Sequence, residues 1–233
     1  MVNVNREGFD FLKALAKNNE REWFNAHRSE YEHMLGNIAD FADGLIEELK
    51  THDLIQTQSG KKALFRIYRD VRFSHDKTPY TLWLSGYFRR ATAQLRGGYY
   101  FRIQPKGKSV LGGGFWGPNK EDLKHIREQI AIDSEPLRKV IASKYFKKHF
   151  GTLNGESLKT YPRGFDPDHP DIDLLRMKTF TVSRSFTDKE VLSADFAKEI
   201  SKGYKAMRPF FDVMSMYLST DLNGDLLPNL SKK

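Results

Sequence analysis

The spacing of apolar residues changes along this chain, and that change limits the folds it can adopt. Between about residues 20 and 50, apolar side chains from Trp23 to Leu49 recur every three to four positions, which predicts one long amphipathic helix. From 64 to 116 the period is two, and β-branched, aromatic and glycine residues replace the helix formers. Helices and strands built from separate stretches in this way indicate an α+β fold.

The alternating region divides into short strands with short connections. We predict strands at 64–73, 81–90, 98–105 and 108–116, and a further one at 178–186. Short connections favour an antiparallel meander. The expected architecture is a central, mainly antiparallel sheet of about five strands, packed with long helices from the N- and C-terminal parts. No linker-like composition interrupts the chain, so a single domain over 1–233 is expected.

Capping signals set the limits of the helices. Asn19 with Glu22, and Thr187 with Glu190, have the spacing of a capping box, and the second pair predicts a helix running to about 218. The remaining expectations are a short helix at about 6–17, helices starting after Asn119 and Ser134, a loop over 151–170, and a frayed tail from Thr220.

Composition excludes several classes of protein. The 233 residues include no cysteine, which rules out disulfides, thiolate catalysis and cysteine-ligated metal centres. Neither a continuous apolar N-terminal segment nor a stretch of eighteen apolar residues is present. We therefore expect a cytoplasmic protein with no membrane partner.

Positive charge is concentrated in one segment. The formal net charge is +8, but residues 61–108 carry twelve lysines and arginines against two aspartates, a local charge of +10. A field of one sign favours an anionic partner, either a small molecule or nucleic acid. The plainer alternative is a solvated basic surface that contributes only solubility.

Strand alternation sorts the side chains of this basic segment onto two faces. If 64–73 is extended, Phe65, Ile67, Val71 and Phe73 share one face, and Arg69 lies among them, where it needs a carboxylate partner or a bound anion. The opposite face, continued on the next strands, interleaves aromatic rings with arginines, which offers stacking surfaces together with phosphate-binding guanidinium groups. Its members are Arg66, Tyr68, Asp70, Arg72, Trp83, Tyr87, Arg89, Tyr100 and Arg102. Alternatively, a long helix covers this face and its acidic residues pair with the arginines.

Residues 66–80 carry the candidate site. The candidate ligand-binding residues are Arg66, Arg69, Arg72, Lys77, Tyr87, Tyr100 and Arg102, and the candidate catalytic residues are Asp70, Asp76 and Tyr80. A carboxylate, an amine and a phenol can orient a substrate or move a proton. Equally, Asp76 and Lys77 could be ordinary turn residues, with Tyr80 packed in the core.

Two further motifs are weaker. DPDHPDID (166–173) has the residue types of a hard-metal site, but Pro170 fits the first position of a helix whose first turn favours acidic side chains, so we assign no metal ligand. GGGFWGP (112–118) lacks a phosphate-binding fingerprint and is better explained by a bulged or bent strand. No cofactor is indicated.

The pattern R-x-x-R-D-x-R-F followed by D-K-x-x-Y, here Arg66 to Tyr80, resembles the signature of the uncharacterised bacterial domain-of-unknown-function 2461 family. NNEREWF (18–24), GGYYFRIQP (97–105) and LKTYPRGFDPDHP (158–170) also resemble that family. The resemblance covers nearly the whole chain and implies one unit without an established activity. It implies no catalytic role for any residue, and it adds weight to residues 66–80 as a site.

Three hypotheses follow. In the first, the protein binds an anionic ligand or nucleic acid at the arginine-bearing sheet face and residues 66–80. In the second, it is an enzyme acting on a phosphorylated or carboxylated small molecule, which requires a closed pocket with a desolvated carboxylate. In the third, it is a scaffold or partner-binding protein in which every arginine has an internal carboxylate partner.

Overall fold

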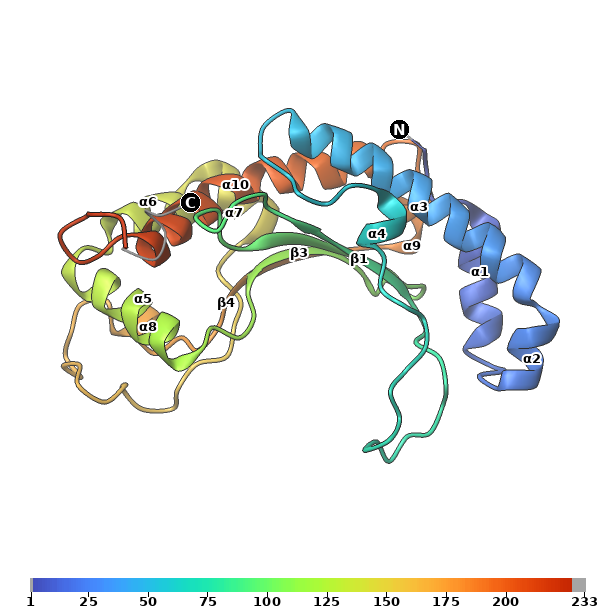
Figure 1. The fold of residues 1–233 in the computed structure, drawn as a ribbon, viewed down its shortest axis with the longest axis horizontal. Coiled ribbons are helices and arrows are strands. Elements are labelled where there is room, and N and C mark those ends of the chain that lie inside the picture. The colour runs from blue at the N-terminus through green and yellow to red at the C-terminus, as the bar shows by residue number, and fades with distance from the viewer. Residues whose placement is uncertain (1, 228–233) are drawn as a thin grey trace. The chain divides into compact units, whose positions relative to one another are not determined.

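The computed structural model describes residues 2–227 and shows an α+β fold. Its four-stranded antiparallel sheet has the order β1 (Leu84–Arg89), β2 (Gly98–Ile103), β3 (Ser109–Phe115) and β4 (Phe180–Phe186). These strands match four of the five predicted ones, and their labels are given in Figure 1.

The predicted strand at 64–73 is wrong. The segment forms only isolated bridges, Leu64 with Gly86 and Tyr68 with Tyr80, and the rest is loop. The predicted apolar face does not exist either, because Phe65 is 53% exposed and Phe73 is 97% exposed, although Ile67 is buried. Turns that begin at Asp70 and Asp76 bend the chain, so no continuous strand forms.

The chain divides into two compact units. The first consists of Met1–Arg89, Tyr99–Leu111 and Ser185–Gly203, and the second of Arg90–Gly98, Gly112–Arg184 and Tyr204–Lys233. Each unit is thus built from three separate stretches. The prediction of a single domain over 1–233 stays a prediction.

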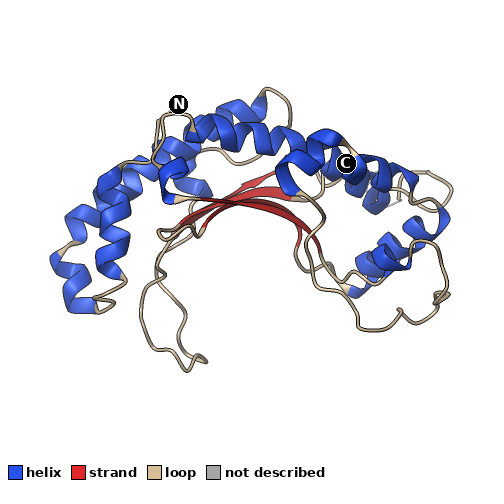
Figure 2. Ribbon diagram, turned by 180° about the vertical axis from the view of Figure 1, so that it is seen from behind, coloured by secondary structure: helices blue, strands red, loops and turns tan. Residues whose placement is uncertain are grey.

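Helices of the first unit lie against one face of its part of the sheet or beside it. They are α1 (Arg6–Leu15), α2 (Arg21–Ala26), α3 (Arg28–Lys50), α4 (Gly60–Ala63), α9 (Asp188–Val191) and the start of α10 (Phe196–Ser219). Phe41 of α3 lies edge-on to Phe101 of β2 at 5.8 Å and stacks on Phe196 at 5.6 Å. Figure 2 shows the helices on this side of the strands.

The second unit is mainly helical. It contains α5 (Lys120–Ile132), α6 (Glu135–Ala142), α7 (Lys144–Phe150), α8 (Ile172–Leu175) and most of α10. Arg90 is fully buried here and donates to Asp212 at 2.7 Å and to the Ser215 hydroxyl at 3.1 Å. Arg96 pairs with Asp122 at 2.5 Å. These two arginines of the basic segment are therefore neutralised by internal partners.

The helix boundaries differ from the prediction in two places. The helix expected at 20–50 is interrupted at His27, and Asn19 makes no cap, since Glu20 is the N-cap residue of α2. The Thr187 to Glu190 capping box is present, but it opens only the short α9. The start of α6 directly after Ser134 is as predicted, although Ser134 makes no side-chain capping bond.

The acidic motif at 166–173 serves packing within the second unit. Asp171 and Asp173 both pair with Arg138, and α8 begins at Ile172, so Pro170 is not its first residue. His169 accepts a hydrogen bond from the Asp171 amide at 3.0 Å. Asn119 caps α5 as predicted, and 151–170 is loop apart from isolated bridges. Most of the predicted tail, from 228 onward, lies outside the described residues.

Two kinds of feature are absent from residues 2–227. None of the helices there has both the length and the apolar character needed to cross a membrane. Within the same residues, no group of three or more histidine, aspartate or glutamate side chains is placed to hold a metal ion.

Candidate functional site

Residues 66–80 form a long loop, called here the 66–80 loop, with two arms and a tip. The arms are tied by bonds from the Arg69 amide to the Pro79 carbonyl (2.9 Å) and from the Thr81 amide to the Ile67 carbonyl (2.8 Å). The loop leaves the sheet on the side opposite α3 and is the long teal segment of Figure 1.

One arm of the loop is clamped to the segment before α2. The Asn19 side chain donates to the Tyr80 carbonyl at 3.0 Å and accepts from the Tyr80 amide at 3.2 Å, as a neighbouring strand would. The Tyr80 ring stacks on Phe24 with centroids 4.0 Å apart and is only 3% exposed. Sequence reasoning missed this clamp because Asn19 also fits a helix cap. The structure places Tyr80, a candidate catalytic residue, as a buried packing residue, and burial raises the pKa of its phenol.

Arg69 and Asp76 cross-link the two arms. The Arg69 guanidinium donates to Asp76 at 2.7 Å and to the Thr78 carbonyl at 3.0 Å, and also bonds the Thr78 hydroxyl. Asp76 accepts from the Thr78 amide at 2.9 Å, which is the bond of an Asx turn. These bonds from Thr78, with the nearby Arg69, lower the pKa of Asp76 to about 2. Arg69 thus has the carboxylate partner that its sequence position required.

A second internal pair shapes the tip. Arg72 donates two hydrogen bonds to Asp70, from Nε at 2.9 Å and from Nη2 at 2.6 Å. The Asp70 carboxylate also accepts from the Arg72 amide at 3.2 Å, which starts the turn. Bonding to Arg72 lowers the pKa of Asp70. The two aspartates are exposed, so neither is the desolvated carboxylate that the enzyme hypothesis requires.

Two cations of the loop have no carboxylate partner among residues 2–227. Arg66 is exposed and makes no ion pair there. Lys77 is also exposed, and its amine donates only to the Val71 carbonyl, at 3.0 Å. Carboxylates of the described residues therefore do not neutralise these two charges.

The expected alternation is observed on β1 and β2. Phe88, Tyr99 and Phe101 are buried towards the helices, while Tyr87, Arg89, Tyr100 and Arg102 belong to the opposite face, called here the arginine face. Burial raises the pKa of Tyr87. Arg102 lies over the Trp83 ring at 5.7 Å and donates to the Lys108 carbonyl at 3.2 Å.

None of the helices of the first unit covers the arginine face in the way that the alternative hypothesis required. In Figure 2 the helices of the first unit lie on the other side of the sheet or beside it. Among residues 2–227, neither Arg89 nor Arg102 forms an ion pair with a carboxylate. The structure therefore separates the predicted ligand-binding residues into two groups: Arg69 and Arg72 are paired internally, whereas Arg66, Lys77 and Arg102 are not.

A groove that no sequence pattern indicated runs along the outer edge of β1. This edge groove has a volume of about 500 Å³. It is lined by Gln56, Thr57, Gln58, Lys62, Ala63, Leu64, Phe65, Tyr87 and Arg89. Only Tyr87 among these was predicted as a ligand-binding residue, because the groove depends on the path of the chain between 56 and 65.

The fold and the site together define an α+β protein whose first unit has a sheet face bearing arginines and aromatic rings that the helices of that unit leave open. Residues 7–213 match the family model described as "Conserved hypothetical protein (DUF2461)", so the chain belongs to this family. No curated protein and no solved structure matches the chain.

Proposed function

We propose that this protein binds an anionic ligand, bearing phosphate or carboxylate groups, at the arginine face and the adjoining 66–80 loop. The observation that carries this proposal is the position of Arg89 and Arg102 and their lack of a carboxylate partner among the described residues. Both lie on an open sheet face beside aromatic rings, and neither has a carboxylate partner among the described residues. Guanidinium groups bind phosphate and carboxylate with two parallel hydrogen bonds, and they stay charged at any physiological pH.

The paired arginines have a different role in this proposal. Arg69 and Arg72 hold the 66–80 loop in shape through Asp76 and Asp70. A shaped loop can then present Arg66 and Lys77 to the ligand at a lower cost in conformational entropy. In this proposal some cations of the 66–80 loop maintain its shape and others bind the ligand.

A thermal-shift experiment on the full chain tests the proposal. Probes are inorganic phosphate, sugar phosphates, nucleotides, carboxylates and short oligonucleotides. An anion present at a hundredfold its dissociation constant stabilises the fold by about 2.7 kcal/mol. For a chain of this length that corresponds to a rise in Tm of roughly 5–10 °C.

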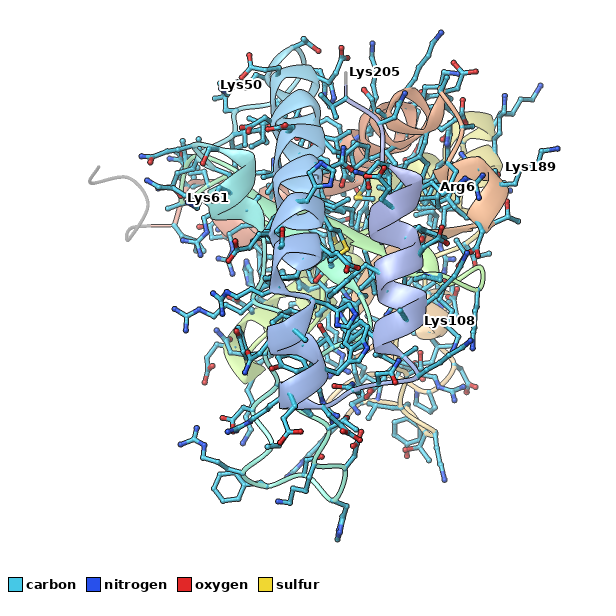
Figure 3. The ribbon with its side chains drawn as sticks, turned by 90° about the vertical axis from the view of Figure 1, so that its right-hand side faces the viewer. Arg6, Lys50, Lys61, Lys108, Lys189 and Lys205 are labelled. Atoms are coloured by element: carbon cyan, nitrogen blue, oxygen red, sulfur yellow. The ribbon has the colours of Figure 1, made fainter. Side chains whose placement is uncertain are left out.

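The variants compare arginines in two places. Arg102→Ala removes a guanidinium from the arginine face and is expected to abolish the shift. Arg6→Ala removes an exposed guanidinium at the start of α1, labelled in Figure 3, and is expected to keep it. The proposal is wrong if no anion stabilises the wild type, or if the shift is the same in both variants.

A further inference from the structure

The edge groove exists because the segment 56–65 is hydrogen-bonded to β1 at two points and lies away from β1 between them. At one end, the Gln56 amide donates to the Arg89 carbonyl and the Arg89 amide donates to the Thr57 hydroxyl, both at 2.8 Å. At the other end, the Phe65 amide donates to the Ser85 carbonyl at 2.9 Å. From Ser85 to Arg89 the strand spans about 13 Å. Tyr87 lies midway between the two contacts.

Helix α4 holds the outer wall in place. The Gly60 amide, at its start, donates to Asp43 of α3 at 2.7 Å. A Cβ on Gly60 would lie 1.9 Å from the Ala39 carbonyl oxygen, so the backbones of α4 and α3 are in close contact. Figure 3 shows α4, with Lys61, beside α3. The groove is therefore preformed, which reduces the ordering cost of binding.

The lining combines charge, aromatic surface and amides. Lys62 and Arg89 supply two cations, and Lys62 Nζ donates a hydrogen bond to the Gln58 side-chain oxygen, which orients it. Phe65 offers a ring that is 53% exposed, and the partly buried Tyr87 adds a second. Cations beside exposed rings are the combination that binds a phosphate together with a flat base. The glutamine amides at the rim carry both donors and acceptors, as the edge of a base does.

We propose that the edge groove is a nucleotide subsite, in which Phe65 stacks on the base while Lys62 and Arg89 bind the phosphate. This proposal rests on the proposed function and specifies its ligand as one that joins a phosphate to an aromatic ring. Such a ligand comes from two sources, a free mononucleotide or a single-stranded nucleic acid. The volume of about 500 Å³ lies in the range of small-molecule sites.

The test measures dissociation constants of the full chain for four probes. AMP and ribose 5-phosphate are measured by calorimetry, and fluorescein-labelled dT4 and dT12 by fluorescence anisotropy. A base-reading subsite binds AMP at least about tenfold more tightly than ribose 5-phosphate, because stacking on an aromatic side chain adds to the phosphate contact. Binding of dT12 that is much tighter than that of dT4 and AMP identifies single-stranded nucleic acid as the source, and equal affinities identify a free nucleotide.

Two pairs of variants locate the binding. Phe65→Ala is compared with Tyr161→Ala, which removes another ring that is 53% exposed and does not line the groove. Lys62→Ala is compared with Lys61→Ala, its neighbour on α4 outside the lining. Phe65→Ala is expected to weaken AMP or oligonucleotide binding roughly tenfold. Lys62→Ala is expected to lower the salt slope of oligonucleotide binding by about 0.7, the value of one phosphate contact. The controls are expected to match the wild type.

The outcomes separate this inference from the proposed function. If ribose 5-phosphate binds as tightly as AMP, or if Phe65→Ala matches Tyr161→Ala, the nucleotide subsite is wrong. In that case anion binding that depends on Arg102 still supports the proposed function. If none of the probes binds and no anion raises Tm, both proposals fail. Circular dichroism spectra of the four variants check that each is folded.

Discussion

Replacement of Asn19 by alanine tests whether the 66–80 loop is held by its clamp. The substitution removes two hydrogen bonds to the Tyr80 backbone, at 3.0 and 3.2 Å, in a partly buried setting. A hydrogen bond of this kind contributes about 1 kcal/mol net, so the clamp contributes about 2 kcal/mol. Because the loop's own bonds remain intact, the loss should appear first as opening of the loop at its Tyr80 end.

Limited trypsin digestion measures this opening directly. The loop contains four cleavage sites, at Arg66, Arg69, Arg72 and Lys77. When opening and closing are fast relative to cleavage, the nicking rate follows the population of the open form, and 2 kcal/mol corresponds to roughly 30-fold faster cleavage. Urea unfolding followed by tryptophan fluorescence should show a matching loss of about 2 kcal/mol.

Asn25→Ala is the matched control. Asn25 is an exposed residue of α2 that makes no side-chain hydrogen bond within residues 2–227, and alanine favours the helix by a few tenths of a kcal/mol. Its nicking rate should therefore equal that of the wild type. Equal rates for Asn19→Ala and Asn25→Ala would refute the clamp, and the position of the loop would then have to depend on ring packing alone.

Three further substitutions have definite expected outcomes. Asp76→Asn should lower the free energy of unfolding at neutral pH. The pKa of Asp76 is about 2 in the folded protein against an ordinary value of 3.8, so its stabilising effect is lost as the pH falls from about 4 to 2. In urea titrations over this range, the difference in unfolding free energy between the variant and the wild type should therefore vanish. Gly60→Ala should destabilise the protein by more than about 2 kcal/mol, because the added Cβ would clash with the backbone of α3. Gly36→Ala should stabilise it by about 0.5–1 kcal/mol, because no atom lies within 4 Å of the added Cβ and alanine favours the helix. Thermal unfolding measures both changes. Asp212→Asn removes the carboxylate that pairs with the buried Arg90, and chemical denaturation should show a loss of about 2 kcal/mol, below that of a fully buried pair because Asp212 is 45% exposed.

The roles of the loop residues also bear on catalysis. A general base needs a pKa near the working pH, whereas hydrogen bonds to Thr78 and Arg72 hold the Asp76 and Asp70 carboxylates well below it. Both side chains start turns, and for Asp76 this was one of the two interpretations open from the sequence. The geometry therefore favours binding over proton transfer by these groups.

Periodicity alone determined most of the secondary structure. The sequence pattern placed β1 to β4 within a few residues of their observed limits. In β1, β2 and β4 the burial of side chains alternates along part of the strand, whereas β3 is buried almost throughout. The capping residues Asn119 and Thr187 marked true helix starts, since their side chains bond amides only three residues away. Such interactions involve residues only a few positions apart and can therefore be predicted from the sequence.

The tertiary structure decided the rest. Alternation at 64–73 predicted a strand, but turns at Asp70 and Asp76 and the clamp from Asn19, sixty-one positions from Tyr80, made the segment a loop. Charge counting could not distinguish Arg90, buried against Asp212, from Arg102 on the open face. The edge groove likewise depends on where the chain leaves β1 and returns. Such contacts join residues far apart in sequence, and their partners are chosen by packing, which no local pattern records.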